Sequence, residues 1–206
     1  KLARAIIRDF PQDYAWYKQK WIKYNGIRQP NRNRLLWRDP SADGLKTGHT
    51  KAAGYCLVAS AKRNDTRLLS VVMGTPTDSA RANDSEALLN WGFRFYKSYK
   101  LFSKATPITS ARVWLGKNKQ IPLGLNQDMY VTIPIGSYPQ LKANMELKQD
   151  IQAPIEKGQP YGDVVISLNG KTISTVPLLA LEDDPTGGMW SKFTDRIAML
   201  FHHWVS

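Results

Sequence analysis

Apolar residues recur at the three- and four-residue spacing of an amphipathic helix in three parts of this chain. The spacing predicts helices over residues 2–10, 78–99 and 190–204, because side chains three or four positions apart share one helix face. Asp78 is the expected cap of the second helix. Five apolar residues define that helix: Ala87, Leu88, Trp91, Phe95 and Tyr99.

Between the first two helices, apolar and polar residues alternate in runs of strand length. Residues 14–24 are rich in aromatics and lysine and indicate a strand or a pair of strands, and Asn25-Gly26 is a turn signal. Residues 26–38 are polar and predict a loop. Three further strands are joined by short connections, which implies antiparallel pairing. They are expected at residues 43–50, 54–62 and 67–73.

The pattern changes near residue 103. Short alternating segments follow, separated by Gly, Pro and Asn, and this is typical of a small β-sandwich-like domain. The sequence therefore predicts an α+β fold with three parts: an antiparallel sheet with helices, a β-rich domain and an amphipathic helix. The predicted limits of these parts are 1–103, 104–184 and 185–206. The expected strands of the β-rich domain are 112–115, 129–133, 141–147, 163–168 and 171–181, with a hairpin turn at Asn169-Gly170.

Positive charge is concentrated in the first third of the chain. The formal net charge is +12, and residues 1–64 hold 14 Lys and Arg against four Asp and Glu. Such an excess suits an anionic ligand or surface. Positive charge is the only feature of the sequence that favours nucleic acid as a ligand, so we expect no nucleic-acid partner. The single cysteine, Cys56, lies in an apolar run and is interpreted as a buried core thiol.

The three histidines do not indicate a metal site. His202 and His203 are adjacent on a predicted helix and would point apart, and no cluster of carboxylates accompanies His49. We therefore expect neither a metal nor a cofactor.

The sharpest local motif is DGLKTGHT at residues 43–50. A bare K-T-G triplet occurs by chance in many proteins. Here it falls on a predicted strand, with two more strands and a long helix behind it. In penicillin-recognising serine enzymes, K-T-G accompanies S-x-x-K and an S-x-N type motif.

In this context the chain resembles the low-molecular-mass penicillin-binding proteins that act as D-alanyl-D-alanine carboxypeptidases, of the penicillin-binding protein 5 and 6 type. Residues 43–50 resemble their third motif, and NGIRQPNRN at residues 25–33 resembles the segment before it. NWGFRF at residues 90–95 and FHHW at 201–204 resemble the helix after the sheet and the terminal anchor. The resemblance implies a serine β-lactamase/transpeptidase-like domain over residues 1–103.

The resemblance also implies roles for five residues. Lys46 supplies positive charge and takes part in proton transfer, and the backbone N–H of His49 is a donor to the oxyanion. Thr47 and Arg32 hold the terminal carboxylate of the substrate. Gly48 permits close approach of an extended peptide. The expected ligands are the peptidoglycan pentapeptide, which loses its terminal D-Ala through an acyl-enzyme, and β-lactams.

The two motifs that accompany K-T-G in this family are absent as chemistry. S-x-x-K does not occur in the chain, and the only S-x-N, at Ser167-Leu168-Asn169, lies beside the hairpin turn and is interpreted as structural. The nucleophile is therefore expected before Lys1, so that the chain is the carboxy-terminal half of the enzyme and inactive by itself. The alternative is a non-catalytic module that binds the membrane surface or the cell wall.

The terminal helix predicts how the protein is located. It follows a Gly-rich break, carries large apolar residues on one face, and suits an anchor lying in the membrane interface. By the resemblance, the protein would sit peripherally on the periplasmic face of the bacterial inner membrane. The residues expected to enter the membrane are Trp190, Phe193, Ile197, Leu200, Phe201 and Trp204.

Overall fold

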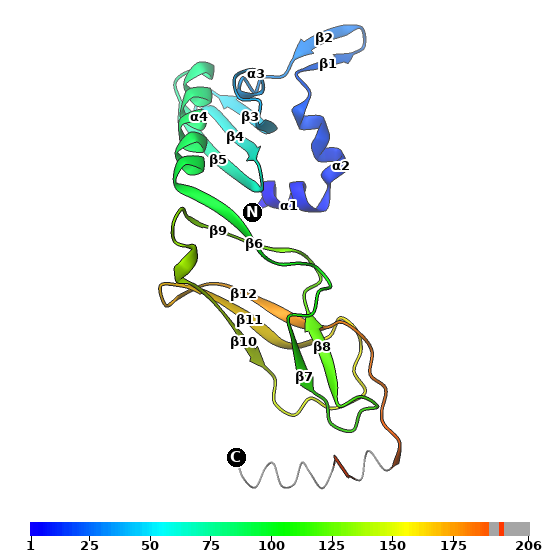
Figure 1. The fold of residues 1–206 in the computed structure, drawn as a ribbon. Helices are drawn as coiled ribbons and strands as arrows, with labels where there is room; N and C mark the ends of the chain where they lie inside the picture. The colour runs from blue at the N-terminus through cyan, green and yellow to red at the C-terminus, as the bar shows by residue number, and fades with distance from the viewer. Residues whose placement is uncertain (190–193, 196–206) are drawn as a thin grey trace. The chain divides into compact units, whose positions relative to one another are not determined.

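The computed structural model describes residues 1–189, 194 and 195. The chain forms two compact units that divide between Ser98 and Tyr99 (Figure 1). The predicted mixture of helices and strands is confirmed, and strands predominate. No helix in the described part is long and apolar enough to cross a membrane.

The first unit contains a three-stranded antiparallel sheet in the order β3-β4-β5, a separate hairpin of β1 and β2, and helices. The turn at Asn64 has a positive φ and connects β4 to β5. The three predicted strands and the first helix are confirmed. The elements are α1 (Leu2–Asp9), α2 (Pro11–Tyr14), η1 (Ala15–Lys18), β1 (Trp21–Tyr24), β2 (Ile27–Pro30), α3 (Leu35–Arg38), β3 (Ala42–Thr50), β4 (Gly54–Arg63), β5 (Thr66–Thr75) and α4 (Asp78–Phe95).

Two predictions for residues 14–38 are wrong in part. The first half of residues 14–24 is helical, because Pro11 begins a new helical turn instead of ending the helical region. The polar stretch 26–38 is not one loop: it contains β2, which pairs with β1 around the turn at Asn25-Gly26, and the short helix α3. Both residues of that turn have positive φ, as a two-residue hairpin loop requires.

Helix α4 also differs from the prediction. It ends at Phe95 rather than Tyr99, and Thr77 rather than Asp78 is its N-cap, accepting a hydrogen bond from the backbone N–H of Ala80. The apolar residues that predicted it do not form its buried face, since Leu88, Trp91 and Phe95 remain about half exposed. The buried positions are Arg81, Ala82, Ser85, Leu89 and Gly92.

The core of the first unit lies between α4, α3 and the sheet. Leu57 and Ala59 of β4 face Leu35 of α3 and Leu89 of α4, and each of these side chains is almost fully buried. Gly92 allows the close approach of α4 to β5, because a Cβ there would lie 2.6 Å from Cδ1 of Leu68. This packing fixes β3, which forms one edge of the sheet.

The second unit is built from a five-stranded antiparallel sheet in the order β10-β11-β12-β8-β7 and a two-stranded pair, β6 and β9. The predicted turn at Asn169-Gly170 joins β11 to β12, and both residues have positive φ. Strand β8 was not predicted. The strands are β6 (Tyr96–Phe102), β7 (Thr109–Arg112), β8 (Gln120–Gly124), β9 (Met129–Pro134), β10 (Leu141–Leu147), β11 (Pro160–Leu168) and β12 (Lys171–Ala180), with a short helix η2 (Tyr138–Gln140).

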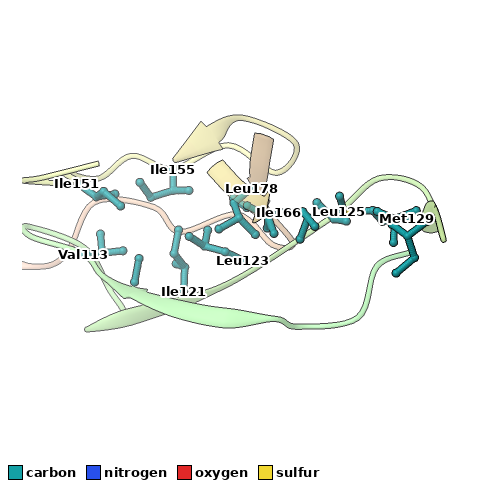
Figure 2. Packing of buried hydrophobic residues seen from close by; sticks show 14 residues of the cluster. Val113, Ile121, Leu123, Leu125, Met129, Ile151, Ile155, Ile166 and Leu178 are labelled. Carbon is teal, nitrogen blue, oxygen red and sulfur yellow. The ribbon is translucent and has the colours of Figure 1, made fainter. Parts of the chain in front are cut away.

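One core holds this second unit together. Figure 2 shows Ile121 and Leu123 of β8 packed with Ile166 of β11 and Leu178 of β12, and the side chains of β9 belong to the same cluster. Every second residue of β9 is buried, as expected for a strand with one face on a core. Residues 99–102 belong to this unit because β6 pairs with β9, so the units divide before the predicted limit at residue 103.

Hydrogen bonds join Asp195, at the end of the described chain, to the rest of the second unit. Asp195 accepts the backbone N–H of Leu115 at 2.9 Å and the ammonium of Lys119 at 2.6 Å. Burial opposes ionisation of Asp195, yet these two donors hold its pKa below the usual range. The six predicted membrane residues, Trp190, Phe193, Ile197, Leu200, Phe201 and Trp204, lie outside the described residues.

Candidate active site

A cleft of about 1290 Å³ opens along β3 in the first unit. Its walls come from the hairpin β1–β2, the loop after it, α3, β3, the start of β4 and the start of α4. All five residues to which the sequence assigned substrate contacts line this one cleft: Arg32, Lys46, Thr47, Gly48 and His49.

The K-T-G strand presents polar groups to the cleft. Lys46 is exposed, and its ammonium donates to the carbonyl oxygen of Thr47 at 2.5 Å. The ring of His49 stacks on Tyr55 of β4, with ring centroids 4.0 Å apart. A Cβ on Gly48 would meet only Cβ of Cys56, at 3.8 Å, which is ordinary contact. Packing therefore does not require glycine at position 48. The better explanation for glycine there is that it leaves the floor of the cleft open.

The position of Cys56 contradicts its sequence-based interpretation. It pairs with Gly48 across β3 and β4 and is partly exposed, so it is not a buried core thiol. The run that contains it is buried at alternate positions only, and Cys56 falls on the other face from Leu57. Its Sγ contacts the carbonyl oxygen of Ala53 at 3.5 Å.

Two asparagines that the sequence reasoning did not single out fix the loop around Arg32. Asn33 is buried; its amide donates to the carbonyl oxygen of Gly44 at 3.0 Å, and its Oδ1 accepts the backbone N–H of Leu35. Asn31 donates to the carbonyl oxygen of Gln19 at 3.0 Å and accepts the backbone N–H of Asn33. Arg32 is thus held between two anchored neighbours.

Arg81 of α4 is a further residue that the sequence reasoning missed. It is 4% exposed, and its guanidinium donates to the carbonyl oxygens of Gly48 at 3.1 Å and Arg32 at 3.3 Å. It also pairs with Asp78, which pairs in turn with Arg34. A charged residue in line with Ser85 and Leu89, on the buried stripe of the helix, was the available signal. Arg81 links the K-T-G strand to the arginine loop.

A polar cluster supports the beginning of β3. Tyr14 donates to Asp43 at 2.5 Å, and Arg67 donates to Asp43 at 2.8 Å and to Ser60 at 2.6 Å. Burial and then the bond to Asp43 raise the pKa of Tyr14 to about 12. Gly44 is required beside this cluster, because a Cβ there would lie 2.8 Å from the hydroxyl of Tyr14.

The cations of the cleft differ in their availability. Arg34 and Arg81 both pair with Asp78. Within residues 1–189, 194 and 195, the exposed guanidinium of Arg32 makes no ion pair or hydrogen bond. A free guanidinium beside a strand with an exposed lysine is suited to bind a carboxylate.

Comparison with known proteins identifies families and relatives that are similar to this chain. The profile of D-alanyl-D-alanine carboxypeptidases matches residues 1–77, and that of the C-terminal domain of penicillin-binding protein 5 matches residues 96–186. The chain is 44% identical to D-alanyl-D-alanine carboxypeptidase DacC of Escherichia coli K12 over 205 residues, and 43% identical to DacA of that strain. These alignments cover 98% of the chain and 51% of each relative, so the chain spans about half the length of the curated relatives it matches.

A solved structure supports the same assignment. The structure of penicillin-binding protein 5 from Haemophilus influenzae superposes with a TM-score of 0.79 at 43% identity, over 89% of this chain and 54% of that one. The two profiles follow one another along the chain, and each falls largely on one of the two compact units. The chain belongs to the family of low-molecular-mass penicillin-binding proteins.

Proposed function

We propose that this chain provides the substrate-carboxylate side of the active site of a serine-type D-alanyl-D-alanine carboxypeptidase, an enzyme that removes the terminal D-Ala from peptidoglycan pentapeptide and binds β-lactams. One observation carries the proposal. Arg32 has no ionic partner in the described chain and lines the same cleft as Lys46, Thr47, Gly48 and His49.

Each residue has a distinct part in the proposed site. Arg32 and the hydroxyl of Thr47 bind the free carboxylate of the D-Ala-D-Ala terminus. The exposed edge of β3 pairs with the extended peptide, and the side-chain-free Gly48 lets that backbone approach. The backbone N–H of His49 donates to the oxyanion, a contribution of roughly 3 kcal/mol in serine hydrolases. Lys46 provides positive charge near the reacting carbonyl and assists proton transfer.

The nucleophile is not in the printed sequence. In the proposed reaction a serine hydroxyl attacks the penultimate carbonyl, the peptide C–N bond breaks, and the departing D-Ala amine takes the proton. Water then hydrolyses the ester. Because S-x-x-K is absent from residues 1–206, the chain alone binds the carboxylate but completes no turnover.

Binding of N-acetyl-D-Ala-D-Ala tests the carboxylate site without needing the nucleophile. Titration followed by NMR should shift the amide resonances of β3 in the wild-type chain. Arg32→Gln should weaken binding about 10-fold, because a charge-assisted pair is lost. Arg94→Gln, which removes an exposed cation from α4, is the matched control and should bind as the wild type does. Equal affinity of both variants would contradict the role of Arg32.

The second candidate function is a non-catalytic module for the membrane surface or the cell wall, and the missing S-x-x-K favours it. Fluorescent penicillin separates the two candidates. If the chain is part of the enzyme, a protein that joins it to the family's S-x-x-K segment should be labelled covalently. Residues 1–206 alone should not be labelled. Absence of labelling in both would leave the binding module as the function.

We also propose that the terminal segment attaches the protein peripherally to the periplasmic face of the inner membrane. The support is the sequence pattern of large apolar residues from Trp190 to Trp204 with Lys192 and Arg196 on other faces.

A further inference from the structure

The segment from residue 14 to residue 38 has an unusual charge pattern. It contains seven Lys and Arg and no Asp or Glu, interleaved with aromatic residues. It forms η1, the hairpin β1–β2 and α3, and Figure 1 shows the hairpin projecting from the body of the first unit. Like charges this close repel one another, so the pattern lowers the stability of the isolated segment.

Internal ion pairs account for only two of the seven cations. Arg34 pairs with Asp78, and Arg38 lies 3.8 Å from Glu86. The others are exposed, and within the described chain none of them has an ion-pair partner. They are Lys18, Lys20, Lys23, Arg28 and Arg32.

Aromatic side chains connect this charged surface to the cleft. The guanidinium of Arg28 lies over the ring of Trp21 at 4.3 Å, and Trp21 meets the edge of Trp37, with ring centroids 6.3 Å apart. Both tryptophans are more than 40% exposed, and both line the cleft together with Arg32 and Lys46. The hairpin is therefore one wall of the cleft and continues it outward.

Packing does not explain the exposed residues of the hairpin. All eight strand residues are exposed, so the hairpin buries neither face. A two-stranded hairpin is only marginally stable in water, and aromatic and cationic side chains on both faces add no internal core. Exposed aromatics combined with unpaired cations are characteristic of a binding surface.

We propose that Lys20, Lys23, Arg28 and Trp21, the basic hairpin surface, dock the carboxylate-bearing peptidoglycan polymer whose stem ends enter the cleft. This inference rests on the proposed function, because the cleft identifies the polymer. A molecule held at its free carboxyl end by Arg32 and Thr47 extends along the wall that borders the cleft. Its stem carboxylates then meet unpaired cations, and Trp21 offers an apolar surface for the aliphatic or sugar portion.

The test compares the full chain with two triple variants of equal charge change. Lys20→Gln/Lys23→Gln/Arg28→Gln neutralises the hairpin, and Lys142→Gln/Lys157→Gln/Lys171→Gln neutralises three exposed cations of the second unit. The probe is soluble uncross-linked glycan bearing pentapeptide stems, with binding followed by tryptophan fluorescence at several salt concentrations. We expect about 10-fold weaker binding for the hairpin variant and less than about 2-fold for the control.

A second probe removes the charge from the ligand instead. Amidating the stem carboxylates of the glycan other than the terminal D-Ala carboxylate, which the cleft binds, should weaken binding to the wild-type chain and should leave the hairpin variant little changed. Unchanged binding of the amidated glycan to the wild type would show that the cations do not bind carboxylates, and would overturn the inference.

N-acetyl-D-Ala-D-Ala separates failure of this inference from failure of the proposed function. The dipeptide reaches only the cleft, so both triple variants should bind it like the wild type. If the wild type does not bind the dipeptide, the proposed function fails. If the dipeptide binds and the hairpin variant retains full affinity for the polymer, only the docking surface is wrong. Tighter binding of duplex DNA than of the glycan at equal salt would identify a different partner and also overturn the inference.

Discussion

The carbonyl oxygen of Gly48 accepts a hydrogen bond from the buried guanidinium of Arg81 at 3.1 Å. The K-T-G strand is an edge strand, and Arg81 reaches it from α4, across a sequence distance of 33 residues. The same guanidinium holds the carbonyl oxygen of Arg32. One buried cation therefore sets the distance between the strand and the arginine that we propose as the two sides of the carboxylate site.

Replacement of Arg81 by Met should destabilise the first unit. The change leaves the carbonyl oxygens of Gly48 and Arg32 without their donor and removes one cationic partner of Asp78. We expect the free energy of unfolding to fall by about 3 kcal/mol, as for other broken buried ion-pair networks. Urea denaturation followed by circular dichroism measures it. Arg94→Met, at an exposed position of the same helix, should change stability by less than about 0.5 kcal/mol.

Two glycines of the same strand should respond differently to alanine. Gly44→Ala places a Cβ 2.8 Å from the hydroxyl of Tyr14, so it should cost about 1–3 kcal/mol of stability through overpacking. Gly48→Ala meets only Cβ of Cys56 at 3.8 Å and should fold normally, but should weaken binding of N-acetyl-D-Ala-D-Ala. Thermal unfolding and NMR titration separate the two effects. A stability loss at Gly48 equal to that at Gly44 would argue for a structural role of both.

The sequence predicted the framework of the site well because the relevant signals are local. Strands β3, β4 and β5 follow one another closely and are joined by short turns, so the local sequence pattern sufficed to predict them. The end of α4 could not be predicted in this way. Residues 96–99 continue the helical spacing of apolar residues but form β6, because pairing with β9 outweighs a local preference.

The residues that support the site were missed for a similar reason. Asn33 and Arg81 act through hydrogen bonds to Gly44 and Gly48, which lie 11 and 33 positions away. No periodicity marks an asparagine in a polar stretch as buried. Arg81 could not be recognised from the sequence because the conspicuous apolar stripe of α4 faces solvent, whereas the buried stripe of this helix includes Arg81 and Ser85.

Alkaline pH should destabilise the first unit through Tyr14. Burial and the bond to Asp43 raise its pKa to about 12 in the folded state, against about 10 in the unfolded chain. Between these values the unfolded chain loses the phenolic proton first, so folding stability should decrease by about 2 kcal/mol as the pH rises from 10 to 12, and not below 10.

Tyr14→Phe isolates this effect. The variant should be less stable than the wild type below pH 10, because Asp43 loses a donor, but its stability should depend less on pH above 10. Urea midpoints at pH 8 to 11.5 provide the measurement. Tyr24→Phe, at an 80% exposed position, is the control and should follow the wild type. Parallel curves for Tyr14→Phe and the wild type would show that Tyr14 does not carry the pH dependence.

Deletion of residues 188–206 should release the protein from membranes. The deletion removes the apolar residues that we propose as the anchor, and with them the main contribution to burial in the membrane interface. It also removes Asp195, so Asp195→Asn is the matched control: it weakens the bonds to Leu115 and Lys119 but keeps the apolar face. Co-sedimentation with phosphatidylcholine–phosphatidylglycerol vesicles, at a salt concentration that screens the basic hairpin surface, measures attachment. We expect the deleted chain in the supernatant and Asp195→Asn in the pellet with the wild type; a deleted chain that still sediments would refute the anchor.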